Sequence, residues 1–543
     1  MRNIKYLLLL IFFSLQLNST AQSNGFEVIK NLELIDLIYM NLEKYYVDEP
    51  KTGEISKVAI DAMLHELDPY TVFYHESNIE DYRMMTTGQY GGIGALIRKV
   101  DDYVIIAEPY ENMPAHQAGL KAGDKIISID DRSMKGKSND EVSTALKGTK
   151  GSSITIKYDR PGEGEQEAKV TRDEIKLPDV PYSGMVDDGI GYIKLNSFTQ
   201  TASKSVKESY EKLASEGMEK VILDLRGNGG GLLIEAVDIV NFFVPKDQVV
   251  VKTKGRILDE NRTYKTRNKP IDLDIPVVVL VDETSASASE IVSGSLQDLD
   301  RGVVVGRTTY GKGLVQRTID LKYGSKMKLT IAKYHTPSGR CVQKLDYYHK
   351  NDGEVDEVPD SLIKIYKTKN GREVIDGRGI EPDIKTKGQK LGRLTAKLMS
   401  ENIVFDYVTN YEKNNPSISP ADEFTLSDKE YEAFKDFALS KNFEYTTASE
   451  EQMKKLLTTA EQEGYDSDIV KEYEALYKKV KASKEKDLDL FKKQIKELIQ
   501  NEIVSRYYFQ EGRVVNAFLT DEALEAAIKV LKDEKRYSEI LKL

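Results

Sequence analysis

Residues 221–231 read Val-Ile-Leu-Asp-Leu-Arg-Gly-Asn-Gly-Gly-Gly. A mostly apolar run is followed by a segment with four glycines, and a helical pattern begins near Leu232. Short, almost wholly apolar runs that alternate with helices are typical of a buried, largely parallel sheet. The same alternation continues on both sides, with strand patterns at 191–195 and 277–281 and a helical pattern at 203–215. The sequence therefore predicts an α/β core, which we place at residues 176–385.

Three other regions surround this core and make the chain multidomain, as its 543 residues lead one to expect. Residues 22–86 carry apolar side chains at three- and four-residue spacing, which predicts helices. Between 87 and 175 the pattern changes to short strands separated by glycines, at 104–107, 125–129 and 154–158. Residues 386–543 are rich in Lys, Glu, Tyr and Leu and poor in Gly and Pro, which predicts a helical extension.

The composition excludes several classes of protein. Apolar residues make up 40% and charged residues 31% of the chain, as in ordinary globular proteins. The formal net charge of −11 would repel a phosphate backbone, so we expect no nucleic-acid partner. The single cysteine, Cys341, cannot form an internal disulfide, so stability must come from packing.

The N-terminus has the order of a secretory signal peptide. Arg2 and Lys5 precede the apolar run 7–17, which small residues follow at 19–21. The run is too short to span a membrane comfortably, and no later segment approaches the necessary length. We predict a signal peptide at residues 1–21, cleavage between Ala21 and Gln22, and export to the periplasm. An uncleaved anchor, which would leave the protein membrane-associated, is the alternative.

A glycine-rich loop opens the small β-rich region. Gly91, Gly92, Ile93 and Gly94 come directly before a strand pattern, and backbone N–H groups in such a loop can bind a carboxylate. Residues 118–129, Ala-Gly-Leu-Lys-Ala-Gly-Asp-Lys-Ile-Ile-Ser-Ile, deliver a second strand in the same way. Together these stretches resemble a PDZ domain, which implies that residues 87–175 capture a peptide C-terminus. The alternative is that the glycines only shape a tight turn.

A serine-rich segment follows the apolar strand of the core. Residues 284–291, Thr-Ser-Ala-Ser-Ala-Ser-Glu-Ile, combine small side chains with a helix-start pattern. A helix N-terminus suits a nucleophile, because its free N–H groups favour developing negative charge. From the residues alone, Ser285, Ser287 and Ser289 are all candidates, and a capping sequence without chemistry is the alternative.

Lys312 is the candidate base for that serine. None of the five histidines lies in residues 224–231, 284–291 or 306–316, and for His335 we predict a structural role. Lys312 lies between two glycines, and Gln316, four residues on, would share its face on a strand. A lysine base must be neutral, which requires its pKa to fall by roughly 3 units, about 4 kcal/mol.

With these residues in view, the sequence resembles the C-terminal processing peptidases, tail-specific serine proteases with a PDZ domain. The resemblance covers about residues 29–383, including Leu-Asp-Pro-Tyr-Thr at 67–71 and Thr-Pro-Ser-Gly-Arg at 336–340. The family places its nucleophile at the middle serine and its lysine 25 positions later, which selects Ser287 and Lys312 here. It further implies a ClpP/crotonase-like protease core with an inserted PDZ domain.

The resemblance also assigns supporting roles. Gln316 would orient Lys312, and the oxyanion hole would be formed by the N–H groups of Ala288 and Gly230, with Gly229 as the alternative second donor. For Asp298 it implies a structural role.

The implied reaction is hydrolysis of peptide bonds, in proteins with accessible C-termini, and it needs no metal or cofactor. Whether the PDZ domain gates the site or only tethers substrate stays open, as does homo-oligomerisation through the terminal helices. An inactive PDZ scaffold and a ligand-binding α/β protein are the rival hypotheses.

Overall fold

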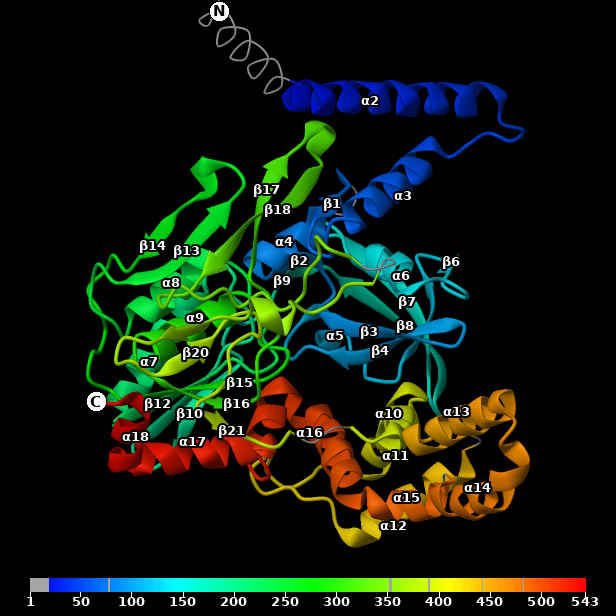
Figure 1. Cartoon of the computed structure of the whole chain (residues 1–543). Coiled ribbons are helices and arrows are strands. Elements are labelled where there is room, and N and C mark those ends of the chain that lie inside the picture. The colour runs from blue at the N-terminus through cyan, green and yellow to red at the C-terminus, as the bar shows by residue number, and fades with distance from the viewer. Residues whose placement is uncertain (1–18, 77–78, 351–353, 389–390, 442, 482) are drawn as a thin grey trace, which may run out of the picture. The chain divides into compact units, whose positions relative to one another are not determined.

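The computed structural model describes residues 19–543 apart from 77–78, 351–353, 389–390, 442 and 482 (Figure 1). Its contacts divide the chain into two compact units, residues 1–77 with 316–330, and residues 78–315 with 331–543. The apolar run of the predicted signal peptide lies outside the described residues, and the predicted cleavage bond falls at the start of the first described helix. Within the described part of the chain, no helix is long and apolar enough to cross a membrane.

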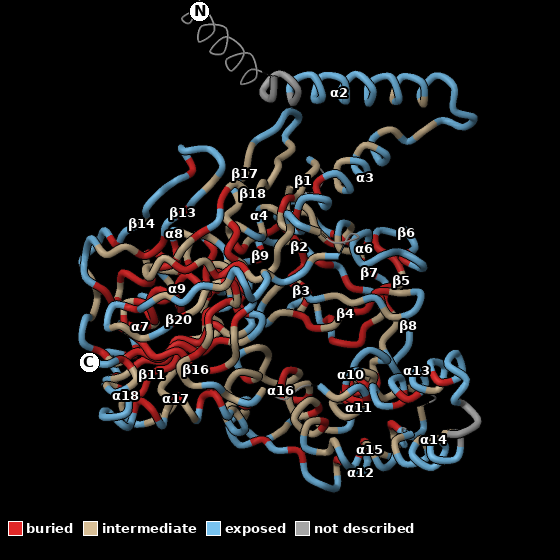
Figure 2. The backbone as a smooth tube through the Cα atoms, in the orientation of Figure 1, coloured by how far each residue is buried: buried red, intermediate tan, exposed pale blue. Residues whose placement is uncertain are grey.

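The first unit contains two of the helices predicted for the N-terminal region and a short strand that was not predicted. Its elements are α2 (Ser19–Tyr45), α3 (Thr52–His65) and β1 (Val72–Tyr74). Strand β1 pairs antiparallel with the first part of β18 (Lys326–His335), with Val72 opposite Lys328. Helix α2 is exposed along nearly its whole described length (Figure 2).

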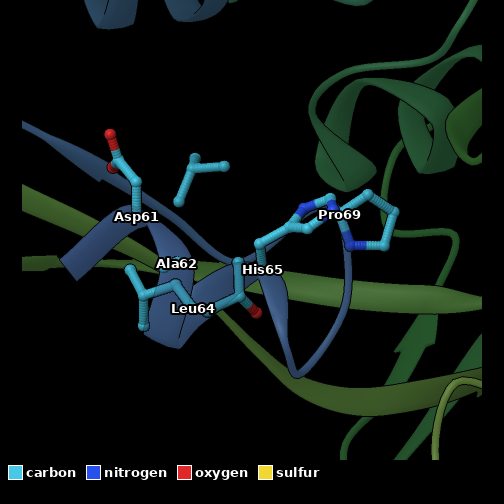
Figure 3. Close-up of a pocket in the computed structure, with 7 residues that line it drawn as sticks. Asp61, Ala62, Leu64, His65 and Pro69 are labelled. Carbon is cyan, nitrogen blue, oxygen red and sulfur yellow. The ribbon is translucent and has the colours of Figure 1, made fainter. Parts of the chain in front are cut away.

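A cavity of about 370 Å³ lies in this unit (Figure 3). It is lined by residues of α3, β1 and the turn between them: Asp61, Ala62, Leu64, His65, Pro69, Thr71 and Val72. It contains none of the side chains predicted to be catalytic.

The small β-rich region of the second unit forms a sheet in the order β3-β4-β5-β7-β8, with β6 beside β5, so that β3 is an edge strand. Apolar residues that alternate along the strands, such as Val104 and Ile106, form its core. The strands of this sheet are β3 (Ala95–Val100), β4 (Tyr103–Pro109), β5 (Lys125–Ile129), β6 (Arg132–Ser133), β7 (Ser153–Arg160) and β8 (Gly164–Thr171). Strands β2 (Gln89–Gly92) and β9 (Asp173–Lys176) form a separate antiparallel pair. Its helices, preceded by α4 (Ile79–Thr87), are α5 (Pro114–Gln117) and α6 (Asn139–Leu146).

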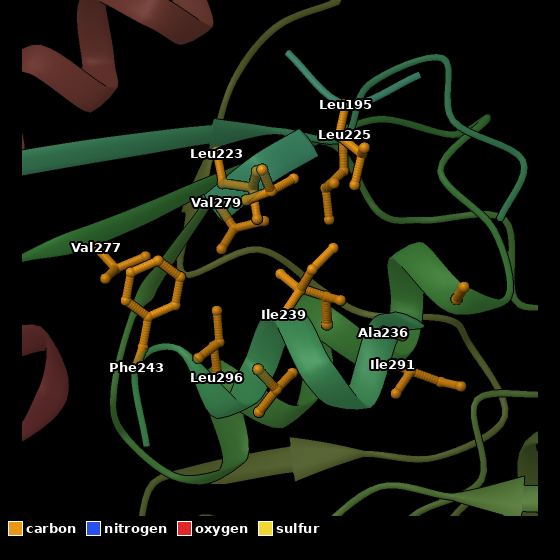
Figure 4. Close-up of a cluster of buried hydrophobic side chains, with 14 of the residues drawn as sticks. Leu195, Leu223, Leu225, Ala236, Ile239, Phe243, Val277, Val279, Ile291 and Leu296 are labelled. Atoms are coloured by element: carbon orange, nitrogen blue, oxygen red, sulfur yellow. The ribbon is translucent and has the colours of Figure 1, made fainter. Parts of the chain in front are cut away.

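The predicted α/β core contains a six-stranded sheet in the order β10-β11-β12-β15-β16-β21, parallel apart from the β10–β11 pair. Helices α7, α8 and α9 bury one face of it. Figure 4 shows side chains of α8 and α9 packed against strand residues such as Leu223 and Val279. The strands are β10 (Tyr182–Asp187), β11 (Ile190–Lys194), β12 (Lys220–Asp224), β15 (Val277–Val281), β16 (Val303–Gly306) and β21 (Ile384–Lys385). The helices are α7 (Ala202–Ser215), α8 (Leu233–Asn241) and α9 (Ala288–Asp298).

Smaller elements also lie between residues 249 and 375. They are β13 (Val249–Gly255), β14 (Thr263–Lys265), β17 (Leu314–Asp320), β19 (Ile365–Lys367), β20 (Glu373–Ile375) and the 3-10 turns 258–260, 322–324 and 360–362. Most of β17 and the turn 322–324 belong to the first unit.

The helical extension divides into two parts. Helices α10, α11, α12, α15 and α16 form their own apolar cluster, whereas α17 and α18 pack on the second face of the core sheet. The helices are α10 (Arg393–Ser400), α11 (Ile403–Asn414), α12 (Asp428–Ser440), α13 (Ala448–Glu463), α14 (Asp466–Val480), α15 (Lys484–Leu490), α16 (Lys492–Ala517), α17 (Glu522–Lys532) and α18 (Glu534–Leu541).

Candidate active site

Ser287 lies between strand β15 and helix α9, directly before the first helical residue, Ala288. Its backbone has φ 56° and ψ −110°, a conformation that L-residues rarely adopt and that is found at functional turns. Ala288 is the first residue of the helix, so its N–H has no acceptor within the helix. Free N–H groups at a helix N-terminus attract negative charge. The segment therefore starts a helix, as predicted, and also holds a serine in a strained turn.

The three candidate serines differ in their surroundings. Ser285 and Ser289 are fully buried, and their hydroxyls donate to the backbone carbonyls of Leu225 and Asn228, both over 2.9 Å. Ser287 is only half-buried. This arrangement favours Ser287 as the nucleophile, because a hydroxyl that bonds a buried carbonyl is neither accessible nor free to react.

A buried carboxylate joins the serine segment to the lysine segment. Glu290 is fully buried, and its Oε2 accepts the backbone N–H groups of Ser287 and Lys312, each over 2.8 Å. Its Oε1 accepts Thr309 Oγ1 over 2.6 Å and Gly311 N–H over 2.7 Å. Burial raises the pKa of Glu290 above its usual value, and the four donors act against that shift. The sequence indicated only a capping residue here, because helix starts commonly carry Glu at this position.

Tight packing explains the glycines on both sides of Lys312. A Cβ on Gly311 would lie 2.5 Å from the Cβ of Lys344, and one on Gly313 would lie 2.8 Å from the backbone nitrogen of Gln343. Lys312 itself is half-buried. It lies two residues before β17 (Leu314–Asp320), outside the strand that the periodicity argument for Lys312 and Gln316 assumed.

The glycine loop after β12 is attached to the serine segment through Asn228. This side chain is buried, and its Nδ2 donates to the carbonyl of Leu195 over 2.8 Å. The backbone carbonyl of Asn228 accepts hydrogen bonds from Ala286 N–H over 3.0 Å and from Ser289 Oγ over 2.9 Å. Asn228 therefore holds the loop against both sides of Ser287.

Gly230 lies closest to the nucleophile within this loop. A Cβ there would be 2.8 Å from the Cβ of Ser287 and 2.9 Å from Ala288 N, and the backbone has φ 100°. Its N–H donates to Asn228 Oδ1 over 2.8 Å. For Gly229 N–H we find no acceptor among the described residues, and a Cβ on Gly229 would meet nothing within 4 Å.

Gln316 belongs to the first unit, where its Nε2 donates to Thr330 Oγ1 over 3.1 Å. Thr330 in turn donates to Asp68 Oδ1 over 3.2 Å, and Asp68 caps the turn of the Leu-Asp-Pro-Tyr-Thr motif by accepting Thr71 N–H over 2.8 Å. The role predicted for Gln316, orienting Lys312, stays a prediction.

Asp298 and His335 make the contacts of structural residues. Asp298 pairs with Arg340 over 2.8 Å, with both side chains buried, and accepts Ser338 N–H over 3.0 Å. Nδ1 of His335 lies 3.0 Å from the carbonyl of Gly339, and burial lowers the pKa of the imidazole. Both residues thus hold the Thr-Pro-Ser-Gly-Arg segment.

The glycine loop of the β-rich region is closely packed and leaves two backbone N–H groups without an acceptor among the described residues. Gly91 has no room for a side chain, since a Cβ would lie 2.1 Å from the carbonyl oxygen of Gly148, and Gly94 has φ 71°. A third glycine, Gly92, ends β2, and Ile93 is buried in the core of the region. Within the described chain, no hydrogen bond leaves the N–H groups of Ile93 and Gly94, which precede the edge strand β3.

No group of three or more His, Cys, Asp or Glu side chains among the described residues is arranged to hold a metal ion. Hydrogen bonds through Asn228 and Glu290 join residues 227–230, 286–290 and 309–312, which contain a serine, backbone N–H groups and a lysine. Groups of these types are able to perform acyl transfer.

Comparison with known proteins gives three matches to family models. A model described as peptidase family S41 matches residues 189–348, a PDZ-domain model matches 105–160, and a model described as the C-terminal helical domain of a probable PDZ-protease matches 394–531.

Individual proteins match as well. A probable CtpA-like serine protease of Staphylococcus aureus (strain COL) is 34% identical over 393 residues, 72% of this chain and 76% of that protein. Its counterpart in Staphylococcus haemolyticus (strain JCSC1435) is 35% identical over 317 residues, 58% of this chain and 63% of that protein. The solved photosystem II D1 C-terminal processing protease is 27% identical, with 64% of this chain and 86% of that chain covered and a TM-score of 0.36.

Proposed function

We propose that this chain, which belongs to peptidase family S41, is an exported serine endopeptidase in which Ser287 is the nucleophile and Lys312 the general base. The observation that carries the proposal is the contact of Glu290 Oε2 with the backbone N–H groups of both residues. One rigid, buried group thereby fixes the two segments to each other. Positioning of this kind supplies much of an enzyme's rate enhancement.

The reaction proceeds through an acyl-enzyme. Lys312 takes the proton of Ser287 Oγ, which attacks the scissile carbonyl carbon, and the carbonyl oxygen becomes an oxyanion. Ala288 N–H and a second N–H, from Gly230 or Gly229, stabilise that oxyanion. Protonated Lys312 gives its proton to the leaving amine and then accepts one from the water that hydrolyses the ester. Gln316 orients Lys312.

Substrate recognition is assigned to the PDZ region. The N–H groups of Ile93 and Gly94 bind the C-terminal carboxylate of a protein, and the edge strand β3 pairs with the extended tail. The substrates are therefore proteins with accessible C-termini. The signal-peptide pattern of residues 1–21 supports export, and we assign the exported protein to the periplasm.

Self-association is assigned to helix α2. Apolar side chains recur along it at alternating four- and three-residue spacing, which is the pattern of a coiled-coil seam: Val28, Leu32, Ile35, Tyr39 and Leu42. Leu32 is 61% and Ile35 50% exposed. A second copy of this chain is the partner that presents a matching seam.

Replacement of each member of the dyad tests the proposed chemistry. Ser287→Ala and Lys312→Ala should each abolish cleavage of an unstructured protein while the thermal unfolding midpoint stays close to that of the native enzyme. A serine-reactive fluorophosphonate should label the native protein and leave Ser287→Ala unlabelled. Cleavage by either variant would exclude the dyad, and a native protein that neither cleaves nor labels would favour an inactive PDZ scaffold.

A further inference from the structure

The last two helices complete the catalytic core. Alternate residues of the central strands face opposite sides, so that Val277, Val279 and Val281 pack under α7 to α9 while Val278 and Leu280 face the other way. That second face is covered by apolar side chains of α17 and α18: Ala523, Leu524, Ala527, Val530, Leu531, Tyr537 and Leu541. Figure 1 shows α17 and α18 beside β12, β10 and β16. The C-terminus of the chain is therefore built into the protease core.

Asp521 is the N-cap of helix α17, and its carboxylate makes two sets of hydrogen bonds. Its Oδ1 accepts the N–H groups of Ala523 and Leu524, both over 3.0 Å, which is an ordinary N-cap. The same carboxylate accepts Nη1 and Nη2 of Arg226 over 2.8 and 2.7 Å. Two parallel bonds between a guanidinium and a carboxylate fix both position and orientation. The side chains of Arg226 and Asp521 are only 20% and 11% exposed, so solvent screens this pair weakly.

Arg226 is held on its other side by Asp224, the last residue of β12. Nη2 of Arg226 donates to Asp224 Oδ2 over 2.7 Å, and the backbone N–H of Arg226 donates to Asp224 Oδ1 over 2.8 Å. Burial of Asp224 would raise its pKa, but Arg226 and Lys194 outweigh burial and lower it. Lys194 Nζ also donates to the carbonyl of Arg226. Arg226 is thus fixed through its side chain, its N–H and its carbonyl.

The loop beside Ser287 starts at the next residue. Gly227 N–H donates to Asp282 Oδ1 over 3.2 Å, and Asn228 then bonds both flanks of the nucleophile as described above. Only three residues separate Arg226 from Gly230, whose Cα leaves no room for a side chain beside Ser287. A displacement of Arg226 would therefore also displace the proposed oxyanion donor in this loop, because the connecting backbone is short and held by several hydrogen bonds.

We infer that Asp521 is a positioning residue for the reaction, which acts through Arg226 on the loop that carries the second oxyanion donor. The inference rests on the proposed function and extends it, because it makes helix α17 part of the catalytic machinery. The bond joins residues 295 positions apart in the sequence.

The test compares two helix caps in the full-length protein. Asp521→Asn keeps the N-cap, since Asn caps as well as Asp, but removes the charge and turns an amide group toward Arg226. Asp533→Asn is the matched control, because Asp533 caps α18 by accepting Arg536 N–H over 2.9 Å and lies on the surface. We expect Asp521→Asn to lower kcat about 10- to 100-fold with KM within twofold, since small displacements of reacting groups have effects of that size. Asp533→Asn should retain native kcat.

Hydrogen exchange gives a second readout that does not depend on activity. Amides of residues 227–230 should exchange faster in Asp521→Asn than in the native protein or in Asp533→Asn. Because Asp521 acts through Arg226, adding Asp521→Asn to Arg226→Lys should change kcat less than twofold further.

Native kcat per titrated active site in Asp521→Asn, or unchanged exchange of the loop, would overturn the inference. A lower unfolding midpoint with native kcat would likewise reduce Asp521 to a helix cap. If the native protein itself neither cleaves nor reacts with a fluorophosphonate, the proposed function fails, and the exchange comparison still decides whether Asp521 controls the loop.

Discussion

The backbone N–H of Lys312 donates a 2.8 Å hydrogen bond to Glu290 Oε2. Because the same oxygen accepts the N–H of Ser287, the two residues proposed to perform the chemistry share one buried acceptor. Glu290 touches neither side chain of the dyad in these bonds. It acts on their backbones, and so sets the separation of two segments that lie 25 residues apart in the sequence.

Replacement of Glu290 by glutamine should therefore damage activity more than its small change in shape suggests. An amide has one acceptor oxygen where the carboxylate has two, so at least one of the four donors loses its partner. We expect the free energy of unfolding to fall by about 1–3 kcal/mol, the cost of leaving a buried donor unsatisfied. We expect kcat to fall about 100-fold, since the separation of nucleophile and base is no longer fixed.

Urea denaturation would measure the free energy of unfolding, and the rate of peptide hydrolysis per titrated active site would measure kcat. Glu208→Gln, on the exposed surface of α7, is the control and should behave as the native enzyme. A Glu290→Gln enzyme that loses stability but retains native kcat would contradict the role assigned to this carboxylate.

The two glycines that compete for the oxyanion hole make a matched pair. Gly230→Ala forces a methyl group to within 2.8 Å of the Cβ of Ser287, whereas Gly229→Ala places one in open space. We expect the first variant to lose at least 100-fold in kcat and the second to remain within about threefold of native, as removal or displacement of one oxyanion donor costs about 10²–10³-fold. Peptide hydrolysis at saturating substrate measures both, and equal kcat values would show that the loop does not line the site.

Gly229→Pro separates the two possible donors. Proline removes the N–H of residue 229 and leaves that of Gly230 in place. Native activity would assign the second donor to Gly230, which would have to turn from Asn228 Oδ1 toward the oxyanion. A loss as large as that of Gly230→Ala, in a variant with a native unfolding midpoint, would assign it to Gly229.

Much of this fold follows from local pattern. The strand predicted at 125–129 is found there, and the helix predicted at 203–215 is α7, because apolar spacing is a local property of the sequence. Strand β1 was missed since its three residues gain their order from β18, which lies more than 250 residues away. The packing of α17 and α18 on the core sheet was also missed, because it too joins segments that are far apart in the sequence. Their amphipathic pattern predicts a helix with a buried face and does not say which surface covers that face.

In the candidate site, too, local sequence features could be predicted and contacts between distant segments could not. The glycine-rich segment 227–231, the serine-rich segment 284–291 and Lys312 between two glycines are conspicuous in the sequence because of their residue types. Ser287 was selected among three serines only through the family resemblance. Glu290 was interpreted as a cap, and Arg226 was read only as part of the loop motif. Their roles depend on partners such as Lys312 and Asp521, which only the folded chain brings close.

The proposed carboxylate receptor predicts a preference for free C-termini. A peptide with a C-terminal carboxylate and the same peptide as its amide should differ about tenfold in KM, because the amide presents no negative charge to the N–H groups of Ile93 and Gly94. Gly94→Ala should remove this difference, as its Cβ would lie 2.5 Å from the Cβ of Met113. Gly136→Ala, also at positive φ but with open space around it, is the control. Equal KM values for both peptides with the native enzyme would show that the loop does not recognise tails.

Helix α2 predicts a dimer. Leu32→Glu combined with Ile35→Glu places two charges in the seam, where each copy would face the same charges on the other. We expect light scattering to give twice the chain mass for the native protein and the chain mass for this variant, because burying an unpaired charge costs several kcal/mol. Lys30→Glu, on the same helix and outside the seam, changes the charge without touching the apolar face and should leave the dimer intact. A native protein that is monomeric at micromolar concentration would exclude the seam as an interface between copies. A variant that remains dimeric would place the interface elsewhere.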